Sequence, residues 1–297
     1  MVAQTRDNGR LPLVSLIICS RNRAQALERC LRALERSDVK EVSSEVVIVD
    51  NASTDTTADV IRSFSQNAGF PVRTAFEPRV GLSYARNAGV GTARGEILAF
   101  TDDDCYVSQR YFAACVQAFS SQEIDYCGGR ILPFSEEDSR YGYNEDNVFK
   151  LIPAGSFIRA GQIQGANMAF RRSLIDRIGV FDPMLGAGTP FRCEDVEYVS
   201  RASLAGFVGA HVPQLSVYHH HGRKLGDIGE LKRLNDFARG AYYAKRIGEG
   251  RLGHVSFWAK ETWQKRKHRS FPQELRGALA YLKARIIHSN DRSRSWP

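Results

Sequence analysis

The sequence predicts an α/β protein in which a largely parallel sheet is flanked by helices and followed by a helical C-terminal extension. Three observations support this fold class. Short apolar runs, typical of strands buried on both faces, alternate with segments of helical spacing over the first two hundred residues. A polar loop follows three of these runs, as expected where parallel strands end at one edge of a sheet. The length of 297 residues allows one large domain and an appendage.

The elements follow in order from these patterns. Strands are expected at LVSLIIC, EVVIVD and EILAF, which are residues 13–19, 45–50 and 96–100. Helices are expected where apolar side chains recur every three or four residues, at 24–34, 53–64, 82–94 and from Ser108 onward. The segment 130–165 shows no such period, and we interpret it as an insertion or a mobile loop.

Three acids, Asp102, Asp103 and Asp104, come directly after the apolar run 96–100. Adjacent carboxylates raise each other's pKa and disfavour folding unless a cation lies near. Asp102 and Asp104 can share a face of an extended chain, while Asp103 points elsewhere. Carboxylates suit Mg²⁺ or Mn²⁺, which take their other ligands from water and phosphates. The alternative is a solvated acidic turn before the helix that begins at Ser108.

Composition limits the cellular setting and the partners. The six cysteines form no CxxC pair, so a reducing cytoplasm is the simplest compartment. The N-terminal residues 1–10 contain no apolar signal-peptide core, and no run approaches a transmembrane span. The net charge of +8 is uneven, because residues 222–297 hold 18 Lys and Arg against 7 Asp and Glu. A cationic end suits phosphate-rich surfaces.

Five segments together resemble one enzyme family: LVSLIICSRNR, VVIVDNASTD, GLSYARNAGVGTARGEILAFTDDD, GANMAFRRSLIDRIGVFD, and CEDVEYVSRASLAGF with VYHHH. Their order and spacing are similar to glycosyltransferase family 2. The resemblance spans about residues 12–222. It implies a GT-A domain at 1–222, with a mixed sheet flanked by helices, and a basic helical extension at 223–297. It also implies an inverting transfer of a sugar from a nucleotide-diphosphate sugar to a hydroxyl acceptor, in envelope polysaccharide, glycolipid or other glycan synthesis.

The resemblance also implies roles for single residues on the nucleotide side. Asp50 would contact the base, for which a uracil-type imide is a suitable donor, so we favour a UDP-sugar. Ser20 and Asn22 would lie near the nucleoside, with Arg21 and Arg23 as candidate phosphate contacts. Arg86 would face the nucleotide. Taken alone, Asp50 would more often be a turn-former, and a lone helical arginine is usually solvated.

The remaining roles concern the metal and the chemistry. In the family pattern Asp102 contacts the nucleotide, with Asp103 assisting, and Asp104 binds Mn²⁺ or Mg²⁺. Asp195, next to Glu194, would be the catalytic base. A histidine about two dozen residues later completes the metal site, which favours His219, with His221 second because it shares a face. Without the resemblance, Glu194 and Asp195 would be common first-turn acids of a helix.

Two rival functions remain. The same acids could serve a nucleotidyl or phosphoryl transferase with two metals, although no further carboxylate is marked for the first site. The cationic tail could instead belong to a non-enzymatic protein that binds anionic surfaces. In the tail, residues 223–297, aromatic side chains flank the KRKHR cluster, a pattern compatible with anionic lipid headgroups or nucleic acid. The resemblance favours contact with an anionic membrane, because many members of the family act on lipid-linked or envelope glycan acceptors. A solvated helix face is the plain alternative. We expect no nucleic-acid partner, and a cytoplasmic or peripheral location at the inner face of the cell membrane.

Overall fold

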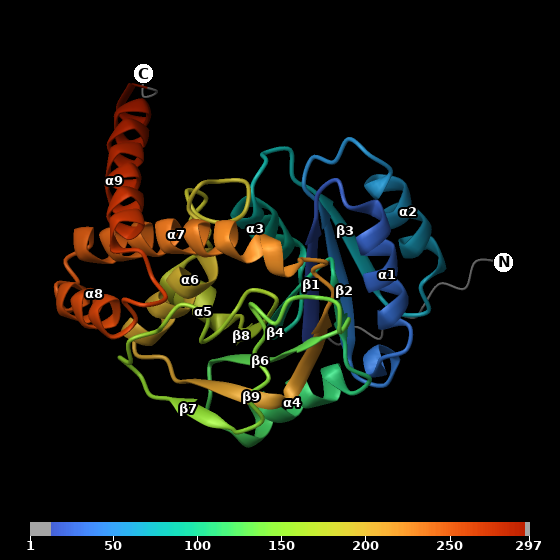
Figure 1. Ribbon diagram of the computed structural model, residues 1–297. Helices are drawn as coiled ribbons and strands as arrows, with labels where there is room; N and C mark the ends of the chain where they lie inside the picture. The colour runs from blue at the N-terminus through green and yellow to red at the C-terminus, as the bar shows by residue number, and fades with distance from the viewer. Residues whose placement is uncertain (1–12, 295–297) are drawn as a thin grey trace.

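The computed structural model describes the backbone of residues 13–294 and the side chains of residues 13–287. These residues form one mixed sheet in the order β3-β2-β1-β4-β8-β6-β9-β5, with β7 paired to β9. Helices cover both faces of the sheet (Figure 1), which confirms the predicted fold class. The N-terminal segment 1–10 lies outside the described residues. The strands are β1 Val14–Ser20, β2 Ser44–Asp50, β3 Val72–Phe76, β4 Ile97–Asp102, β5 Cys105–Val107, β6 Tyr126–Pro133, β7 Lys150–Ile152, β8 Asn167–Arg171 and β9 Gly209–His219.

One half of the sheet is parallel, as the sequence predicts. Strand β1 pairs in parallel with β2 and β4, and β2 pairs in parallel with β3. In the other half, β8 runs antiparallel to β4 and β6, and β5 runs antiparallel to β9. Because β1, β2 and β4 run the same way, their polar ends share one edge of the sheet.

Alternate residues of the parallel strands pack into two cores. Leu16 and Ile18 of β1 lie in one core with α1, α2 and α4, whereas Ile17 lies in the other with α3, α6 and α7. Strands buried on both faces need apolar side chains at every position, which explains the continuous apolar runs. The helices are α1 Ala24–Leu34, α2 Thr57–Asn67, α3 Leu82–Thr92, α4 Tyr111–Ser121, α5 Ser173–Ile178, α6 Glu194–Leu204, α7 Ile228–Gly248, α8 Gly253–Gln264 and α9 Phe271–Arg294.

The segment 130–165 is more regular than the sequence predicts. Strand β6 extends into it, and β7 pairs antiparallel with β9. A bridge between Ile131 and Asn144, and a 2.8 Å contact between His211 Nε2 and the Asp146 carbonyl oxygen, tie the intervening chain to the sheet. Our interpretation as an insertion or mobile loop is therefore wrong for these strands. A three-residue edge strand with two exposed positions leaves no periodic signal.

The C-terminal extension is helical, as expected, but it packs as part of the body. Ala241 and Tyr242 of α7 belong to the same core as residues of α3 and α6. None of the described helices combines the length and the apolar content that a membrane span requires.

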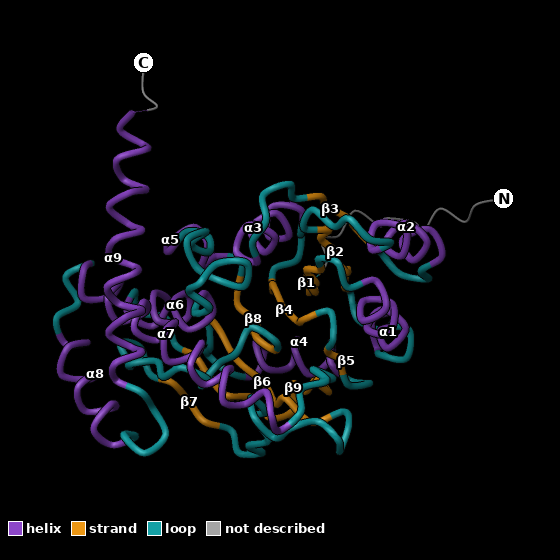
Figure 2. The backbone as a smooth tube through the Cα atoms, turned by 45° about the horizontal axis from the view of Figure 1, so that its top comes forward, coloured by secondary structure: helices purple, strands orange, loops and turns teal. Residues whose placement is uncertain are grey.

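Helix α9 crosses α7 at two glycines and then projects from the body (Figures 1 and 2). A Cβ atom on Gly240 would lie 1.7 Å from the Glu274 carbonyl oxygen, and one on Gly277 would lie 1.8 Å from the Phe237 carbonyl oxygen. Only glycine allows the two backbones to approach this closely. The crossing therefore fixes where α9 leaves the body.

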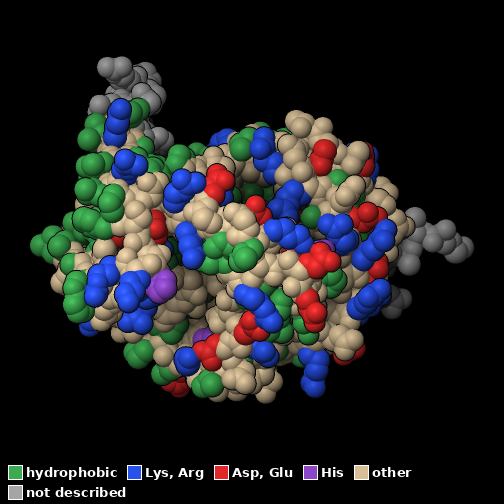
Figure 3. Space-filling model, viewed as in Figure 1, with side chains coloured by type: hydrophobic (Ala, Val, Ile, Leu, Met, Phe, Trp, Pro, Cys, Tyr) green, Lys and Arg blue, Asp and Glu red, His purple; other side chains and the backbone are tan. Residues whose placement is uncertain are grey.

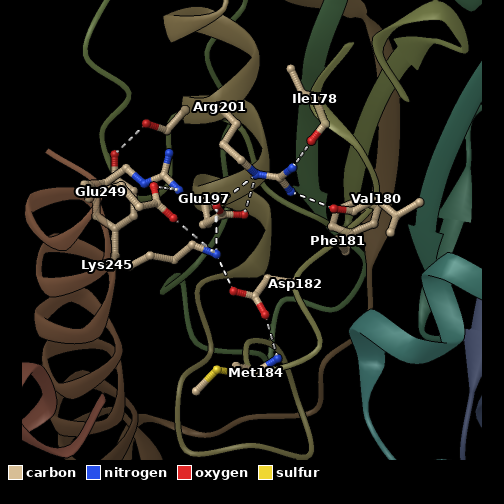
Figure 4. A network of polar contacts seen from close by, with 12 residues as sticks. Ile178, Val180, Phe181, Asp182, Met184, Glu197, Arg201, Lys245 and Glu249 are labelled. Atoms are coloured by element: carbon tan, nitrogen blue, oxygen red, sulfur yellow. Dashed lines mark hydrogen bonds and ion pairs between the residues drawn. The ribbon is translucent and has the colours of Figure 1, made fainter. Parts of the chain in front are cut away.

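A buried ion network joins α6 to α7 (Figure 4). The fully buried carboxylate of Glu197 lies 2.5 Å from Arg246 and 3.2 Å from Lys245, and it accepts a hydrogen bond of 2.9 Å from Arg201. Lys245 also pairs with Asp182. The buried acid is thus surrounded by cations that come from the extension as well as from the body.

Candidate active site

Three strand ends that the sequence predicts to be neighbours lie side by side. Ser20 is paired with Asp50 at the ends of β1 and β2, and Cys19 is paired with Asp102 at the end of β4. In-register parallel pairing places these positions at one edge, where open α/β sheets bind ligands. The candidate nucleotide residues of three separate loops therefore meet at this edge.

Two of the three adjacent acids converge with a histidine just beyond β4. Strand β5 begins directly after the acids and pairs with β9, so that Cys105 lies opposite His219. His219 Nε2 lies 3.1 Å from an oxygen of Asp104. One ligand atom from each of Asp102, Asp104, Cys105 and His219 lies within 4.8 Å of the others. We call these four residues the acid–histidine group.

Asp103 points elsewhere, as the alternation of an extended chain predicts. Its carboxylate accepts a hydrogen bond of 2.6 Å from the Ser20 hydroxyl. It also lies 3.0 Å from the guanidinium of Arg23, which in turn lies 2.6 Å from Asp104. Arg23 thus supplies positive charge to both acids, and His219 gives Asp104 a second polar partner. The Arg23 side chain is 47% exposed, so a ligand can reach it.

The surroundings separate the pKa values of these acids. Burial raises the pKa of Asp103 to about 7, and the ion pair with Arg23 and the Ser20 hydrogen bond only partly offset it. Burial would raise the pKa of Asp104 as well, but His219 and Arg23 outweigh burial and lower it to about 2. Asp104 is therefore the acid held most firmly in its charged form.

Arg86 and Glu194 form a buried ion pair behind the group. The Arg86 side chain is 3% exposed and lies 2.8 Å from Glu194 and 3.7 Å from Asp102. Burial raises the pKa of Glu194 to about 7, although Arg86 opposes the rise. We expected Arg86 to face the nucleotide and Glu194 to join the catalytic pair. In the structure the two side chains pair with each other and are 3% and 9% exposed.

Asp195 remains accessible at the start of α6. Its two oxygens accept hydrogen bonds from the backbone N–H groups of Gly165, at 2.9 Å, and of Val196, at 2.7 Å. Gly165 also lies against Arg86, because a Cβ atom on Gly165 would be 2.2 Å from Arg86 Nη2, and this nitrogen lies 3.7 Å from Asp102. Asp195 is thus next to the acid–histidine group. A carboxylate held by two N–H groups keeps free lone pairs that can accept a proton.

The two expected nucleoside loops are tied to each other. Asn22 adopts a positive φ of 54°, and its side-chain oxygen accepts a hydrogen bond of 2.7 Å from the N–H of Thr54. Asp50 accepts a hydrogen bond of 3.0 Å from the N–H of Ser53 and is 7% exposed. Asp50 thus also acts as the turn-former that its position alone would indicate.

The side chains of the three successive histidines do not all point the same way, as expected. His220 points away from the group and lies 3.1 Å from the Tyr106 hydroxyl. His221 is the expected metal residue that the structure does not place in the group. Its ring stacks on Tyr143, and its Nδ1 accepts a hydrogen bond of 3.0 Å from the N–H of Arg223. The geometry therefore favours His219 over His221.

Comparison with known proteins decides the family. The profile of glycosyl transferase family 2 matches residues 15–179, more than half of the chain. The chain belongs to glycosyltransferase family 2. Among curated relatives, glycosyltransferase AglE of Haloferax volcanii is 27% identical over 257 residues, which are 84% of this chain and 80% of AglE. Validoxylamine A glucosyltransferase of Streptomyces hygroscopicus subsp. jinggangensis is 34% identical over 110 residues, which are 36% of this chain and 26% of that enzyme.

Solved structures of glycosyltransferases share the fold. The mannosyltransferase PcManGT from Pyrobaculum calidifontis, in complex with GDP-Man and Mn²⁺, is 20% identical with a TM-score of 0.63 over 99% of this chain and 86% of that chain. TarS 1–349 of S. aureus, in complex with UDP, is 18% identical with a TM-score of 0.57 over 75% of this chain and 64% of that chain. The GT-A fold expected from the sequence is confirmed. Family membership supports glycosyl transfer over the rival nucleotidyl transfer and the non-enzymatic role.

The acid–histidine group fits the divalent ion that the family resemblance implies. Two carboxylates and an imidazole suit Mn²⁺, and the oxygens alone suit Mg²⁺. The fourth member, Cys105, was missed in the sequence, where it appears as a small buried hydrophobe. Burial raises the pKa of its thiol well above the usual value, so the thiol stays protonated and is a poor ligand. Gly165, whose N–H holds Asp195, was also missed, although it opens the segment GANM.

Proposed function

We propose that this family member transfers a sugar from a nucleotide-diphosphate sugar to a hydroxyl acceptor with inversion at the anomeric carbon. The observation that carries the proposal is that Asp195 adjoins the acid–histidine group through Gly165 and Arg86 at the carboxyl edge of the sheet. Similar folds in PcManGT with GDP-Man and in TarS with UDP-GlcNAc support a nucleotide-sugar donor. We propose a UDP-sugar as the donor and an envelope polysaccharide or glycolipid as the acceptor.

The donor would lie across the strand ends. In this proposal Asp50, Ser20 and Asn22 line the site of the nucleoside, because their loops meet at the edge and are tied together. Asp103 positions Ser20 through their hydrogen bond. Arg23 is exposed enough to turn from the acids toward a diphosphate.

The metal would be held by Asp104 and His219, with Asp102 beside them. When bound, Mn²⁺ or Mg²⁺ supplies the positive charge that stabilises the departing diphosphate. The low pKa of Asp104 keeps this ligand ionised at neutral pH. Arg86 holds Asp102 from behind, and Glu194 holds Arg86, so these two residues position the group without touching the substrate.

Asp195 would be the general base. Its carboxylate takes the proton of the acceptor hydroxyl, whose oxygen forms the new bond to the sugar C1. The bond from C1 to the diphosphate oxygen breaks at the same time, and the nucleoside diphosphate leaves with that electron pair. The N–H groups of Gly165 and Val196 keep the carboxylate aimed at the hydroxyl. A positioned base of this kind contributes about 10²- to 10⁴-fold in rate.

The test is Asp195→Asn, which keeps the shape of the side chain but removes the base. Transfer to an acceptor should fall by at least about 10²-fold, while the affinity for the donor nucleotide in the presence of Mn²⁺ stays the same. Asp176→Asn, on the exposed face of α5, is the control and should be fully active. Unchanged transfer by the Asp195 variant would remove the proposed mechanism.

We further propose that the extension, residues 223–297, attaches this catalytic body, residues 1–222, to an anionic membrane. The apolar side chains of Phe271, Leu275, Leu279 and Leu282 are 48%, 44%, 59% and 40% exposed. Their spacing of four, four and three residues places them on one face of α9. Hydrophobic atoms line the outer edge of this projecting helix (Figure 3). A stripe of this kind is costly in water and stabilising in the boundary of a bilayer.

The positive charge of residues 251–287 favours contact with a membrane over contact with a second copy of the chain. Between residues 251 and 287 both acids, Glu261 and Glu274, are buried, at 2% and 0% exposure. The exposed lysines and arginines of this stretch are Arg251, Lys260, Lys265, Arg266, Lys267, Arg276, Lys283 and Arg285. A self-contact would bring these like charges together, whereas anionic headgroups would neutralise them.

A liposome sedimentation assay tests this attachment. The protein should sediment with vesicles that contain phosphatidylglycerol, less so at high salt, and not with phosphatidylcholine alone. Leu275→Ser with Leu279→Ser should weaken binding at least about tenfold, because two apolar anchors are lost. The matched control is Val148→Ser with Leu151→Ser, at exposed apolar side chains outside the extension. Equal binding by both double variants, or a concentration-dependent dimer that only the α9 variant disperses, would contradict the membrane assignment.

A further inference from the structure

A cavity of about 700 Å³ opens between α1 and the ribbon formed by β5 and β9. We call it the arginine cavity, because arginines dominate its wall. Its volume lies within the range of about 300–1,000 Å³ that is common for small-molecule sites. Its wall includes Arg29, Arg32, Arg36 and Arg110 together with the aromatic side chains of Tyr106, Phe134 and Tyr218.

Helix α1 and the chain just beyond it present their arginines to the cavity as one face. Arg29, Arg32 and Arg36 follow each other at intervals of three and four residues, and Arg110 reaches the cavity from the start of α4. The opposite face of α1 packs into the first hydrophobic core. This packing fixes the helix, so the cationic face cannot rotate away from the cavity.

The positive charge of the arginine cavity is poorly compensated. No carboxylate is among its lining residues. Arg32 pairs with Glu28 at 2.5 Å, but both side chains are exposed, at 69% and 49%, and such a pair is weak. For Arg36 and Arg110 the described part of the chain provides no ion pair. Clustered cations repel each other, so an anion bound among them would relieve the repulsion.

Aromatic rings form one side of the same cavity. The rings of Tyr106 and Phe134 meet edge to face, with centroids 4.5 Å apart. Phe134 is 54% exposed and Tyr218 is 42% exposed, which is unusual for side chains of this size. Exposed aromatic faces beside arginines can pack against a sugar ring or a base while the guanidinium groups hold an anion.

The arginine cavity and the acid–histidine group lie on opposite faces of one ribbon. In the pairing of β5 with β9, Cys105 lies opposite His219, and Tyr106 lies opposite Tyr218. The first pair belongs to the acid–histidine group, and the second lines the cavity. Successive residues of a strand point to opposite faces. The cavity is therefore a separate site from the proposed donor site.

We propose that the arginine cavity binds a small phosphorylated ligand whose ring packs on Tyr218 and Phe134. The planar guanidinium groups match two oxygens of a phosphate at once, and several arginines together can hold a dianion. The ring could be that of a phosphorylated sugar or of a nucleotide, and both share the phosphate. Such a ligand would bind without the divalent ion that the proposed donor site needs.

The experiment is calorimetric titration of the full chain in EDTA, which keeps divalent ions from the acid–histidine group. The probes are inorganic pyrophosphate, glucose 1-phosphate and UDP. Arg36→Ala with Arg110→Ala should weaken binding of each probe at least about tenfold, because two charge-assisted contacts are lost. The control is Arg62→Ala with Arg177→Ala, which removes the same charge at exposed sites elsewhere and should bind as the wild type does.

Further readouts identify the ring and separate this site from the donor site. If glucose 1-phosphate binds more tightly than pyrophosphate and Tyr218→Ala removes the difference, the ligand is a phosphorylated sugar. If instead UDP binds more tightly than pyrophosphate and Tyr218→Ala removes that difference, the ligand is a nucleotide. The extra UDP binding that appears when Mn²⁺ replaces EDTA belongs to the donor site, so the Arg36 and Arg110 double variant should keep this metal-dependent increment. No binding of any probe by the wild type in EDTA, or an equal loss in the control variant, would overturn the proposal.

Discussion

Two clusters of charged side chains in this protein contain similar residue types but differ in role. In the network of Glu197, one buried carboxylate is surrounded by Arg201, Lys245 and Arg246. In the acid–histidine group and its neighbours, three adjacent carboxylates share Arg23, Arg86 and His219. In the first cluster three cations surround one carboxylate. In the second, the half-exposed Arg23 is shared by two carboxylates, Asp103 and Asp104.

The difference separates a structural cluster from a ligand site. Glu197 is fully buried and its carboxylate is paired with side chains of the protein, so it is closed to a ligand. At the edge of the sheet, the pKa of Asp103 is raised to about 7 mainly by burial, a sign that its charge is not fully matched. Because perturbed acids cluster at functional sites, we propose that the divalent ion and the diphosphate bind next to Asp103, at the acid–histidine group.

The largest effect on stability should come from Glu197→Ala. The substitution leaves Lys245 and Arg246 buried without their central acid, and breaking a buried pair in this way costs about 3–5 kcal/mol. Urea unfolding followed by circular dichroism measures the loss. Glu123→Ala, at an exposed glutamate, is the control and should change the free energy of unfolding little. A similar small change for Glu197→Ala would erase the distinction between the two clusters.

At the acid–histidine group, substitutions should instead reduce the stabilisation that a bound metal ion provides. Mn²⁺ at about one hundred times its Kd should stabilise the wild-type fold by about 2.7 kcal/mol through mass action. Asp104→Asn and His219→Ala should each lose most of this metal-dependent gain, because they remove members of the group. The measurement is the difference between unfolding with and without Mn²⁺, so each variant is its own reference.

His221→Ala tests which of the two candidate histidines belongs to the metal site. His221 stacks on Tyr143 outside the group, so this variant should keep the stabilisation by Mn²⁺. A loss equal to that of His219→Ala would return His221 to the metal site and contradict the geometry.

The smallest effect should be the pH dependence from Asp182, at the edge of the structural network. Burial opposes its ionisation, but Lys245 outweighs burial and holds the pKa of Asp182 below the usual 3.8. Because the folded pKa is lowered, the contribution is present above 3.8 and is lost as the pH falls through the folded value. The carboxylate is 22% exposed, so the effect is smaller than that of Glu197.

Unfolding of the wild type and Asp182→Asn from about pH 6 to about pH 3 measures this contribution. The wild type should be more stable at the upper end, and the two curves should approach each other in acid. Parallel curves would show that Lys245 does not stabilise the ionised form.

Local pattern was enough to predict the candidate site in outline. The carboxyl ends of β1, β2 and β4 could be located because each is a continuous apolar run that stops at polar residues. The opposite directions of Asp102 and Asp103 follow from the strand period. Arg86 and Glu194 could not be assigned in the same way, because their pairing depends on how α3 packs against α6.

The sequence by itself determined which residues stand at the edge of the sheet, since strand ends and alternation depend on neighbours along the chain. Only the tertiary structure decided which charges meet there. The pairing of β5 with β9 places His219 beside Asp104, and the packing of α7 against α6 surrounds Glu197 with cations. Both results come from contacts between distant segments, because Coulomb energy depends on separation in space and on local burial.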